Sequence, residues 1–117
     1  MSINNVLAGV AVKNLDSSAK WYEQLIGHAG KHPMKEVFEW SLPGGGVLQV
    51  FEDPKRAGSS SVTFAVKGID DHVAQLSERG VRIGRRTKSD AVSTAIVEDL
   101  DGNQVVLAEQ HSEKLAR

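Results

Sequence analysis

The chain of 117 residues contains no cysteine. Disulfides, thiolate nucleophiles, iron–sulfur clusters and cysteine-ligated zinc sites are therefore excluded. The chain also lacks a charge excess, since its formal net charge is −1, and this gives no electrostatic reason to expect nucleic acid or an anionic membrane as a partner. No apolar stretch approaches the roughly 20 residues that cross a bilayer, and residues 1–5 do not resemble a signal peptide. We therefore expect a cytoplasmic protein.

What the chain does contain is an internal repeat. The segment from Ala11 to Asp16 returns as Ala65 to Asp70, and the segment 45–52 is paralleled by 102–109. Both copies of the first segment follow an apolar, strand-like run and begin a helix-like run, which ends at Gly27 in one copy and at Gly80 in the other. A repeat of this length indicates two similar modules that face each other, with the functional groove between them.

Local patterns place a helix in each module, flanked by strands. Asp16, Ser17 and Ser18 offer N-cap oxygens for the first helix, and Gly27 suits a left-handed C-cap. Asp70 or Asp71 would cap the second helix. A polar loop is expected over 85–91 and a frayed or short helical end over 111–117. The expected strands cover residues 6–12, 37–42, 47–51, 61–66, 81–83, 94–97 and 104–108.

These elements predict an α+β fold with two βαβββ modules in tandem. The modules would form a curved, partly open barrel of mixed sheet with the helices outside. We expect one domain over 1–117, with modules at about 1–53 and 61–111 and a polar linker at 54–60.

Alternation along the strands separates two faces of the predicted sheet. One face is uniformly apolar and is expected to pack under the helices; its members are Val10, Val12, Leu48, Val50, Val62, Phe64, Val66, Val105 and Leu107. The other face mixes small, apolar and polar residues. Because small residues fill a core poorly, that face is expected to leave a cleft for a small ligand. The alternative is that it closes into a packed barrel or a dimer contact.

The segment 12–27 resembles the opening of the vicinal oxygen chelate superfamily, in which a strand is followed by Asp-Leu, Ser, Phe-Tyr and Leu-Gly. Here these places hold Asn14-Leu15, Ser18, Trp21-Tyr22 and Ile26-Gly27, and the closing Asp-Pro-Asp-Gly-Asn pattern of the superfamily is matched by residues 99–103. The superfamily contains glyoxalase I, bleomycin-resistance proteins, fosfomycin-resistance enzymes and extradiol dioxygenases. The resemblance covers nearly the whole chain and implies paired modules around a cleft, often in a homodimer.

The resemblance also implies where a metal would be bound. Metal-dependent relatives carry four ligand positions on the cleft face, and the matched motifs place these at Leu7, Gln49, Ser61 and Val106. Relatives with a metal have His, Gln or Glu there, whereas only Gln49 could coordinate in this chain. One amide oxygen does not hold a divalent transition metal against water. We therefore expect no metal and no cofactor.

The cleft face supplies the candidate ligand-binding residues. Gln49 would anchor a ligand by a hydrogen bond, unless a neighbour or water satisfies it. Ser61 and Thr63 could add hydroxyl contacts, but neither has a visible base partner for nucleophilic catalysis. The full set of candidates is Leu7, Glu39, Trp40, Gln49, Phe51, Ser61, Thr63 and Val106.

One alternative concerns the 37–42 strand. If Phe38 and Trp40 face the cleft, they form a stacking platform for a planar ligand; if they face the helices, they are core and Glu39 points into the groove. The four histidines assemble no site. Arg85, Arg86 and Lys88 form either a basic loop that meets an anionic group or a solvated loop.

Three functions remain open. The preferred one is a metal-independent protein that binds or sequesters a small apolar or aromatic molecule in the cleft. The second is an enzyme, with lyase, isomerase or dioxygenase-like activity, that uses a metal at ligands such as Glu39, Glu98 and a histidine, or metal-free acid–base catalysis. The third is an interaction module whose cleft is only a dimer surface. In each case we expect a homodimer and no nucleic-acid or membrane partner.

Overall fold

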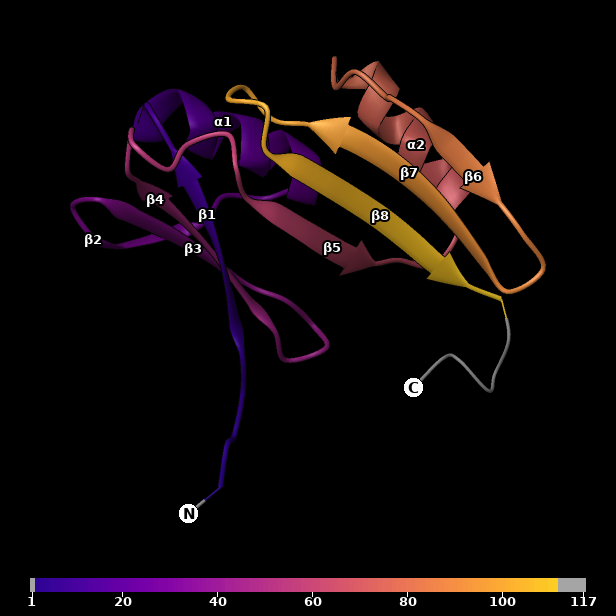
Figure 1. Ribbon diagram of the computed structural model, residues 1–117, viewed down its shortest axis with the longest axis horizontal. Helices are drawn as coiled ribbons and strands as arrows, with labels where there is room; N and C mark the ends of the chain where they lie inside the picture. The colour runs from indigo at the N-terminus through magenta and orange to yellow at the C-terminus, as the bar shows by residue number, and fades with distance from the viewer. Residues whose placement is uncertain (1, 112–117) are drawn as a thin grey trace.

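A computed structural model describes residues 2–111. It contains two βαβββ modules, each with a four-stranded mixed sheet and one helix (Figure 1). Sheet A has the order β1-β4-β3-β2 and sheet B has the order β5-β8-β7-β6. In module 1 the elements are β1 (Leu7–Val12), α1 (Leu15–Ile26), β2 (Lys31–Met34), β3 (Val37–Ser41) and β4 (Val47–Glu52). In module 2 they are β5 (Ser61–Ala65), α2 (Ile69–Glu78), β6 (Arg86–Lys88), β7 (Val92–Glu98) and β8 (Gln104–Gln110).

The repeat seen in the sequence is also a repeat of strand register. β1 pairs with β4 in parallel and places Ala11 beside Phe51, while β5 pairs with β8 in parallel and places Ala65 beside Ala108. An offset of 54 residues for the first strand and 57 for the last maps one ladder onto the other. The predicted fold class and its two modules are therefore confirmed.

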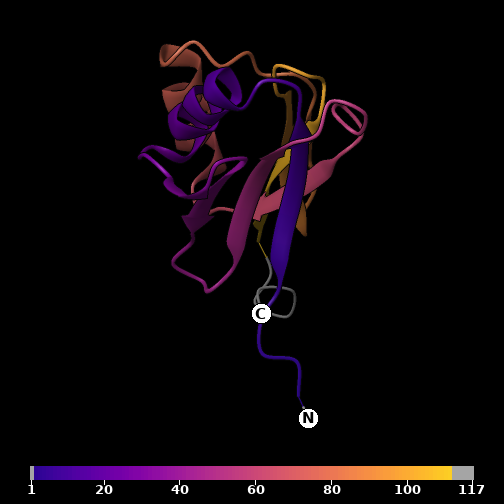
Figure 2. The same ribbon diagram turned by 90° about the vertical axis from the view of Figure 1, so that its left-hand side faces the viewer.

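Both helices lie on the same side of the sheets (Figure 2). They cover the apolar strand face as predicted, because Val10, Val12, Leu48, Val50 and Val105 are all buried there. The opposite face, called the open face below, carries no helix. Residues 2–111 form no closed barrel, because the two sheets are not joined by strand pairing. Their edge strands β1 and β5 contact each other.

The helix caps differ from the sequence-based expectation. Helix α1 begins earlier, and Asn14 is its N-cap because its Oδ1 accepts from Ser17 N at 3.0 Å. Gly27 ends the helix with φ of 102°, as expected. Helix α2 has no side-chain cap of its own. Instead, the Glu109 carboxylate of β8 accepts from Gly68 N at 2.8 Å and Ile69 N at 3.0 Å.

Both short edge strands also differ from the prediction, since one was missed and the other was expected at different residues. β2 lies in a segment that gave no strand pattern, because it contains a proline and begins with two consecutive polar residues; the proline is tolerated at the sheet edge. β6 falls within the segment expected to be a loop, whereas residues 81–83 are not a strand.

The expected tail conformation lies outside the described residues beyond position 111. No helix in the described range is long and apolar enough to cross a membrane.

Candidate functional site

One junction between the modules is closed by a hydrogen-bond network around Asn103. This buried side chain donates from Nδ2 to Ala11 O of β1 at 2.8 Å, and its Oδ1 accepts from Ser60 N at 2.8 Å. Ser60 Oγ in turn accepts from Ala11 N at 3.1 Å. The amide therefore ties the turn before β8 to the edge strands of both sheets, and we call this set of bonds the Asn103 bridge.

The bridge continues through Asp99 into helix α1. Tyr22 Oη donates to Asp99 Oδ2 at 2.7 Å, and Asn103 Nδ2 donates to the same oxygen at 2.8 Å. Asp99 Oδ1 accepts from the backbone N–H groups of Asp101 and Asn103, both at 2.9 Å. Burial of the Tyr22 phenol, together with the neighbouring Asp99 carboxylate, raises the pKa of Tyr22 far above its ordinary value. The phenol therefore stays protonated and acts as a donor.

The internal repeat identifies the residues at the equivalent junction, which the turn between β3 and β4 of module 1 forms with module 2. The same offsets map Tyr22 onto Leu76, Asp99 onto Leu42 and Asn103 onto Gly46. None of these replacements has a side chain that can donate or accept a hydrogen bond. The second junction therefore cannot form a counterpart of the Asn103 bridge.

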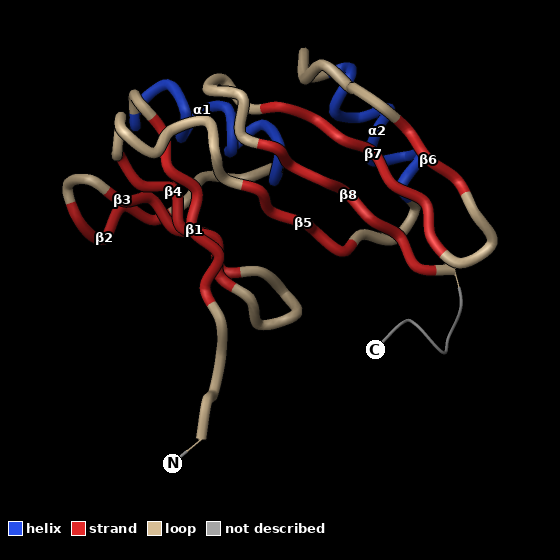
Figure 3. The backbone as a smooth tube through the Cα atoms, in the orientation of Figure 1, coloured by secondary structure: helices blue, strands red, loops and turns tan. Residues whose placement is uncertain are grey.

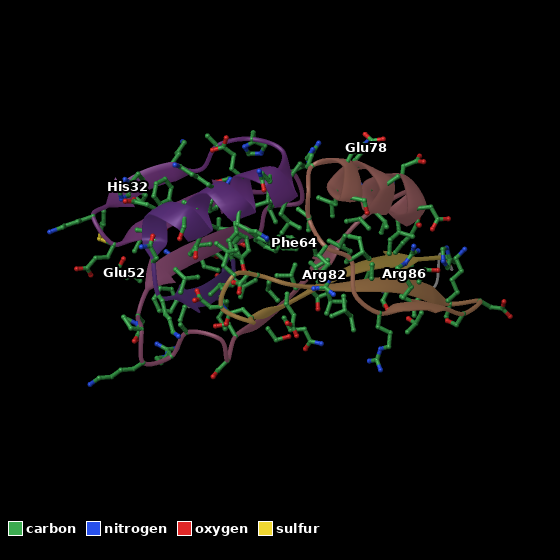
Figure 4. The ribbon with its side chains drawn as sticks, turned by 90° about the horizontal axis from the view of Figure 1, so that it is seen from above. His32, Glu52, Phe64, Glu78, Arg82 and Arg86 are labelled. Atoms are coloured by element: carbon green, nitrogen blue, oxygen red, sulfur yellow. The ribbon has the colours of Figure 1, made fainter. Side chains whose placement is uncertain are left out.

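A pocket of about 440 Å³ lies at this second junction, and we call it the junction pocket. It is bounded by the end of α1, the turn between β3 and β4, the edge strand β5 and helix α2, and Figure 4 shows Phe64 between the two helices. Its lining is mostly apolar and consists of Leu25, Ile26, Leu42, Pro43, Gly44, Gly46, Thr63, Phe64, Ala65, Val66, His72, Leu76 and Leu107. Its volume lies within the range of small-molecule sites.

The pocket is a direct consequence of the broken repeat. Leu42, Gly46 and Leu76 all line it, and so do Ala65 and Val66, the counterparts of Ala11 and Val12. A Cβ added at Gly46 would meet no atom within 4 Å. Where module 2 uses polar side chains to close its junction, module 1 leaves apolar space.

The sequence-based site residues are distributed over both sheets. Register places Leu7, Glu39, Gln49 and Phe51 on the open face of sheet A and places Ser61, Thr63 and Val106 on that of sheet B. Gln49 Nε2 donates to Glu39 Oε2 at 2.5 Å, so this amide already has a protein partner. Of the eight candidates, only Thr63 lines the junction pocket.

Trp40 resolves the alternative left open for its strand. Its side chain is 1% exposed on the helix-covered face, and its Nε1 donates to His28 O at 2.9 Å. Phe38 shares that face and stacks on His32, with ring centroids 4.2 Å apart. The aromatic platform on the open face therefore does not form, Trp40 is a core residue, and Glu39 lies on the open face.

The residues at the four inferred metal positions do not fit a metal. Leu7 and Val106 carry no donor atom, so the four positions offer only two neutral oxygens, the Ser61 hydroxyl and the Gln49 amide oxygen. No group of three or more His, Asp or Glu side chains within residues 2–111 is placed to hold an ion. The alternative set of Glu39, Glu98 and a histidine is thus not assembled in a single chain.

Sequence reasoning missed the principal lining of the junction pocket. Leu42 was assigned to the end of the expected strand 37–42, and Leu25, Ile26 and Leu76 were not among the candidate site residues. His72, one of the four histidines for which no site was expected, also lines the pocket. The signal was present in the repeat, because aligning its two copies shows apolar residues or glycine where the other copy has Tyr22, Asp99 and Asn103.

Comparison with solved structures supports the fold. A glyoxalase/bleomycin resistance protein from Catenulispora acidiphila is 30% identical and superposes with a TM-score of 0.83, over 90% of this chain and 96% of that one. TnmS3, an antibiotic binding protein from Streptomyces, is 23% identical with a TM-score of 0.78, over 94% and 98% of the two chains. A glyoxalase-related enzyme from Clostridium phytofermentans is 16% identical with a TM-score of 0.77, over 94% and 97%. No protein-family model and no curated protein matches the chain.

Proposed function

This chain belongs to the glyoxalase/bleomycin-resistance protein family of the vicinal oxygen chelate superfamily, and from that premise we propose that it binds a small apolar or aromatic molecule in the junction pocket. The observation that carries the proposal is the pocket itself. It is a hollow of about 440 Å³ with leucine, isoleucine, valine and phenylalanine walls, at the one module junction that has no polar bridge. The solved structure of TnmS3, an antibiotic binding protein with the same fold, supports this proposal.

Affinity would come mainly from apolar area removed from water. Each Å² contributes about 25 cal/mol before the ordering costs of association are subtracted. Thr63 and His72 are the polar groups of the lining that could orient a ligand by hydrogen bonds. We infer that binding needs no metal, because leucine, serine and valine stand at three of the four positions where metal-dependent relatives carry ligands.

The proposal is tested with N-phenyl-1-naphthylamine, an uncharged aromatic probe that fluoresces in apolar surroundings. The wild-type protein is expected to bind it with or without a chelator present. Gly46→Leu is expected to weaken binding by roughly tenfold or more, since the added side chain would occupy pocket space that the probe needs. Leu42→Asp should do the same by placing a carboxylate in the apolar lining.

Ser41→Leu is the matched control for these variants. It adds the same side chain one residue before Leu42, at an exposed position on the open face, and should leave probe affinity unchanged. Absence of probe binding to the wild type, loss of binding on chelation, or equal weakening in the Ser41 variant would each contradict the proposal.

We further propose that the protein is a cytoplasmic homodimer. Its N-terminal segment supports association, because Ile3, Val6 and Leu7 are 95%, 72% and 49% exposed. In Figure 3 the residues before β1 lead away from both sheets. Apolar surface exposed to water in this way favours a protein–protein contact when it forms a contiguous patch.

Sedimentation equilibrium tests the homodimer. A mass of twice the 12.6 kDa chain is expected for the wild type, and a shift toward one chain mass is expected for Val6→Asp combined with Leu7→Asp, because burying unpaired carboxylates at a contact is costly. A monomeric wild type would refute the dimer and leave the pocket proposal standing.

A further inference from the structure

A second hollow lies on sheet B and shares no residue with the junction pocket. Its volume is about 590 Å³, and we call it the arginine pocket. It is lined by Arg82, Ile83, Gly84, Arg85, Ile96, Glu98, Asp99 and Gln104. Ile96, Glu98 and Gln104 belong to the open face, since Ile96 pairs with Val106 and Glu98 pairs with Gln104.

The segment that carries its two arginines is fixed against β7. Gly84 N donates to Ile96 O at 2.8 Å, and Ile96 N donates to Arg85 O at 2.9 Å. A Cβ at position 84 would lie 2.7 Å from Ile96 O, so only glycine permits this close approach. The backbone between Arg82 and Arg85 is therefore held along the rim of the pocket.

The structure divides the basic segment that looked like one cluster in the sequence. Arg86 Nη2 lies 2.8 Å from Asp70 Oδ1, and Lys88 Nζ lies 3.8 Å from Asp70 Oδ2. Both cations are therefore engaged with helix α2. Arg82 and Arg85 form no ion pair with any residue of the described range 2–111, and Figure 4 shows Arg82 and Arg86 at different points along the sheet.

The two carboxylates of the pocket also differ in whether protein groups already bind them. Asp99 accepts hydrogen bonds from Tyr22, Asn103 and two backbone N–H groups, so its oxygens are already used. Glu98 is exposed at the end of β7 and would repel a bound anion. The groups left to contact a ligand are two guanidinium groups, the Gln104 amide, one carboxylate and the apolar surface of Ile83 and Ile96.

We propose that the arginine pocket is a second binding site, which takes a small organic molecule bearing an oxyanion such as a carboxylate, phosphate or sulfonate. A guanidinium group presents paired donors that match two oxygens of such a group. Gln104 adds an amide donor, and the two isoleucines contact the organic part. This site does not depend on the junction pocket, and it requires an anionic ligand whereas the junction pocket takes an uncharged one.

Isothermal titration calorimetry with two probes tests the proposal. 8-Anilinonaphthalene-1-sulfonate and N-phenyl-1-naphthylamine share an aromatic body, and only the first carries an oxyanion. The wild type is expected to bind the sulfonate at one site more per chain than the uncharged probe. Arg82→Gln combined with Arg85→Gln should weaken that additional site by roughly tenfold or more, because it removes the charge-assisted hydrogen bonds to the oxyanion. Binding of the uncharged probe should not change.

Two further variants make the result decisive. Lys67→Gln combined with Lys88→Gln removes the same charge outside the pocket and should leave both probes unaffected. Glu98→Gln should tighten the sulfonate by roughly two- to fivefold, as expected for loss of an exposed like charge. Equal site numbers for the two probes, or equal weakening in both double variants, would overturn the proposal. Failure of the uncharged probe alone would overturn only the junction pocket.

Discussion

Replacing Asn103 by alanine is expected to lower the free energy of unfolding by about 4 kcal/mol. The change removes three side-chain hydrogen bonds from a residue that is 1% exposed. It also leaves Ala11 O and Ser60 N without this partner at a closed junction, and each buried unsatisfied group costs about 1–3 kcal/mol. Because domains of this size are stable by only about 5–15 kcal/mol, the loss would be a large share of the total.

Urea unfolding followed by fluorescence of the two tryptophans measures this effect. Asn4→Ala is the matched control, because Asn4 is exposed near the N-terminus and only accepts from Ser2 at 3.2 Å. Its expected change is within about 0.5 kcal/mol. A loss of less than about 1 kcal/mol for the Asn103 variant would mean that the bridge does not hold the modules together.

A second large effect is expected at alkaline pH. Burial and the Asp99 carboxylate raise the pKa of Tyr22 in the folded protein, whereas an unfolded tyrosine ionises at about pH 10. Above about pH 10 the unfolded chain therefore binds fewer protons than the folded one. The contribution of Tyr22 to stability is complete below that pH and decreases above it by about 1.4 kcal/mol per pH unit.

Tyr22 is the sole tyrosine of the chain, so tyrosinate absorbance reports on this residue alone. The absorbance should stay flat through pH 10 and then rise together with the loss of circular dichroism. Tyr22→Phe serves as the comparison, and its stability should fall less steeply with pH in the same range. Ionisation near pH 10 in a protein that remains folded would show that the phenol is not buried against Asp99.

The repeat was sufficient to predict the architecture, because its two copies carry both the strand and helix patterns and the register. The offset of 54 residues that relates Ala11 to Ala65 in the sequence also relates the strand β1 and its pairing to the strand β5 and its pairing. The alternation of apolar residues along the strands likewise predicted which sheet face the helices cover. These features are set by local periodicity, which a single sequence displays.

Tertiary contacts decided the features that the sequence could not supply. Glu109 caps helix α2 from a strand about 40 residues later, so no local cap signal exists. The face of Trp40 depends on register with β4, which an uncertain loop length concealed. Leu42 and Gly46 became significant only when placed opposite Leu76 and β5. The candidate site arises where the two modules differ, whereas the fold follows from where they agree.

Methyl NMR spectra recorded during titration with N-phenyl-1-naphthylamine test the location of binding most directly. We expect shifts concentrated at Leu25, Leu42, Val66 and Leu76, which line the junction pocket. Val47 and Val106 on the open faces should move little. Shifts confined to those two valines, or no saturable shifts at all, would contradict the claim that the unbridged junction is the binding site.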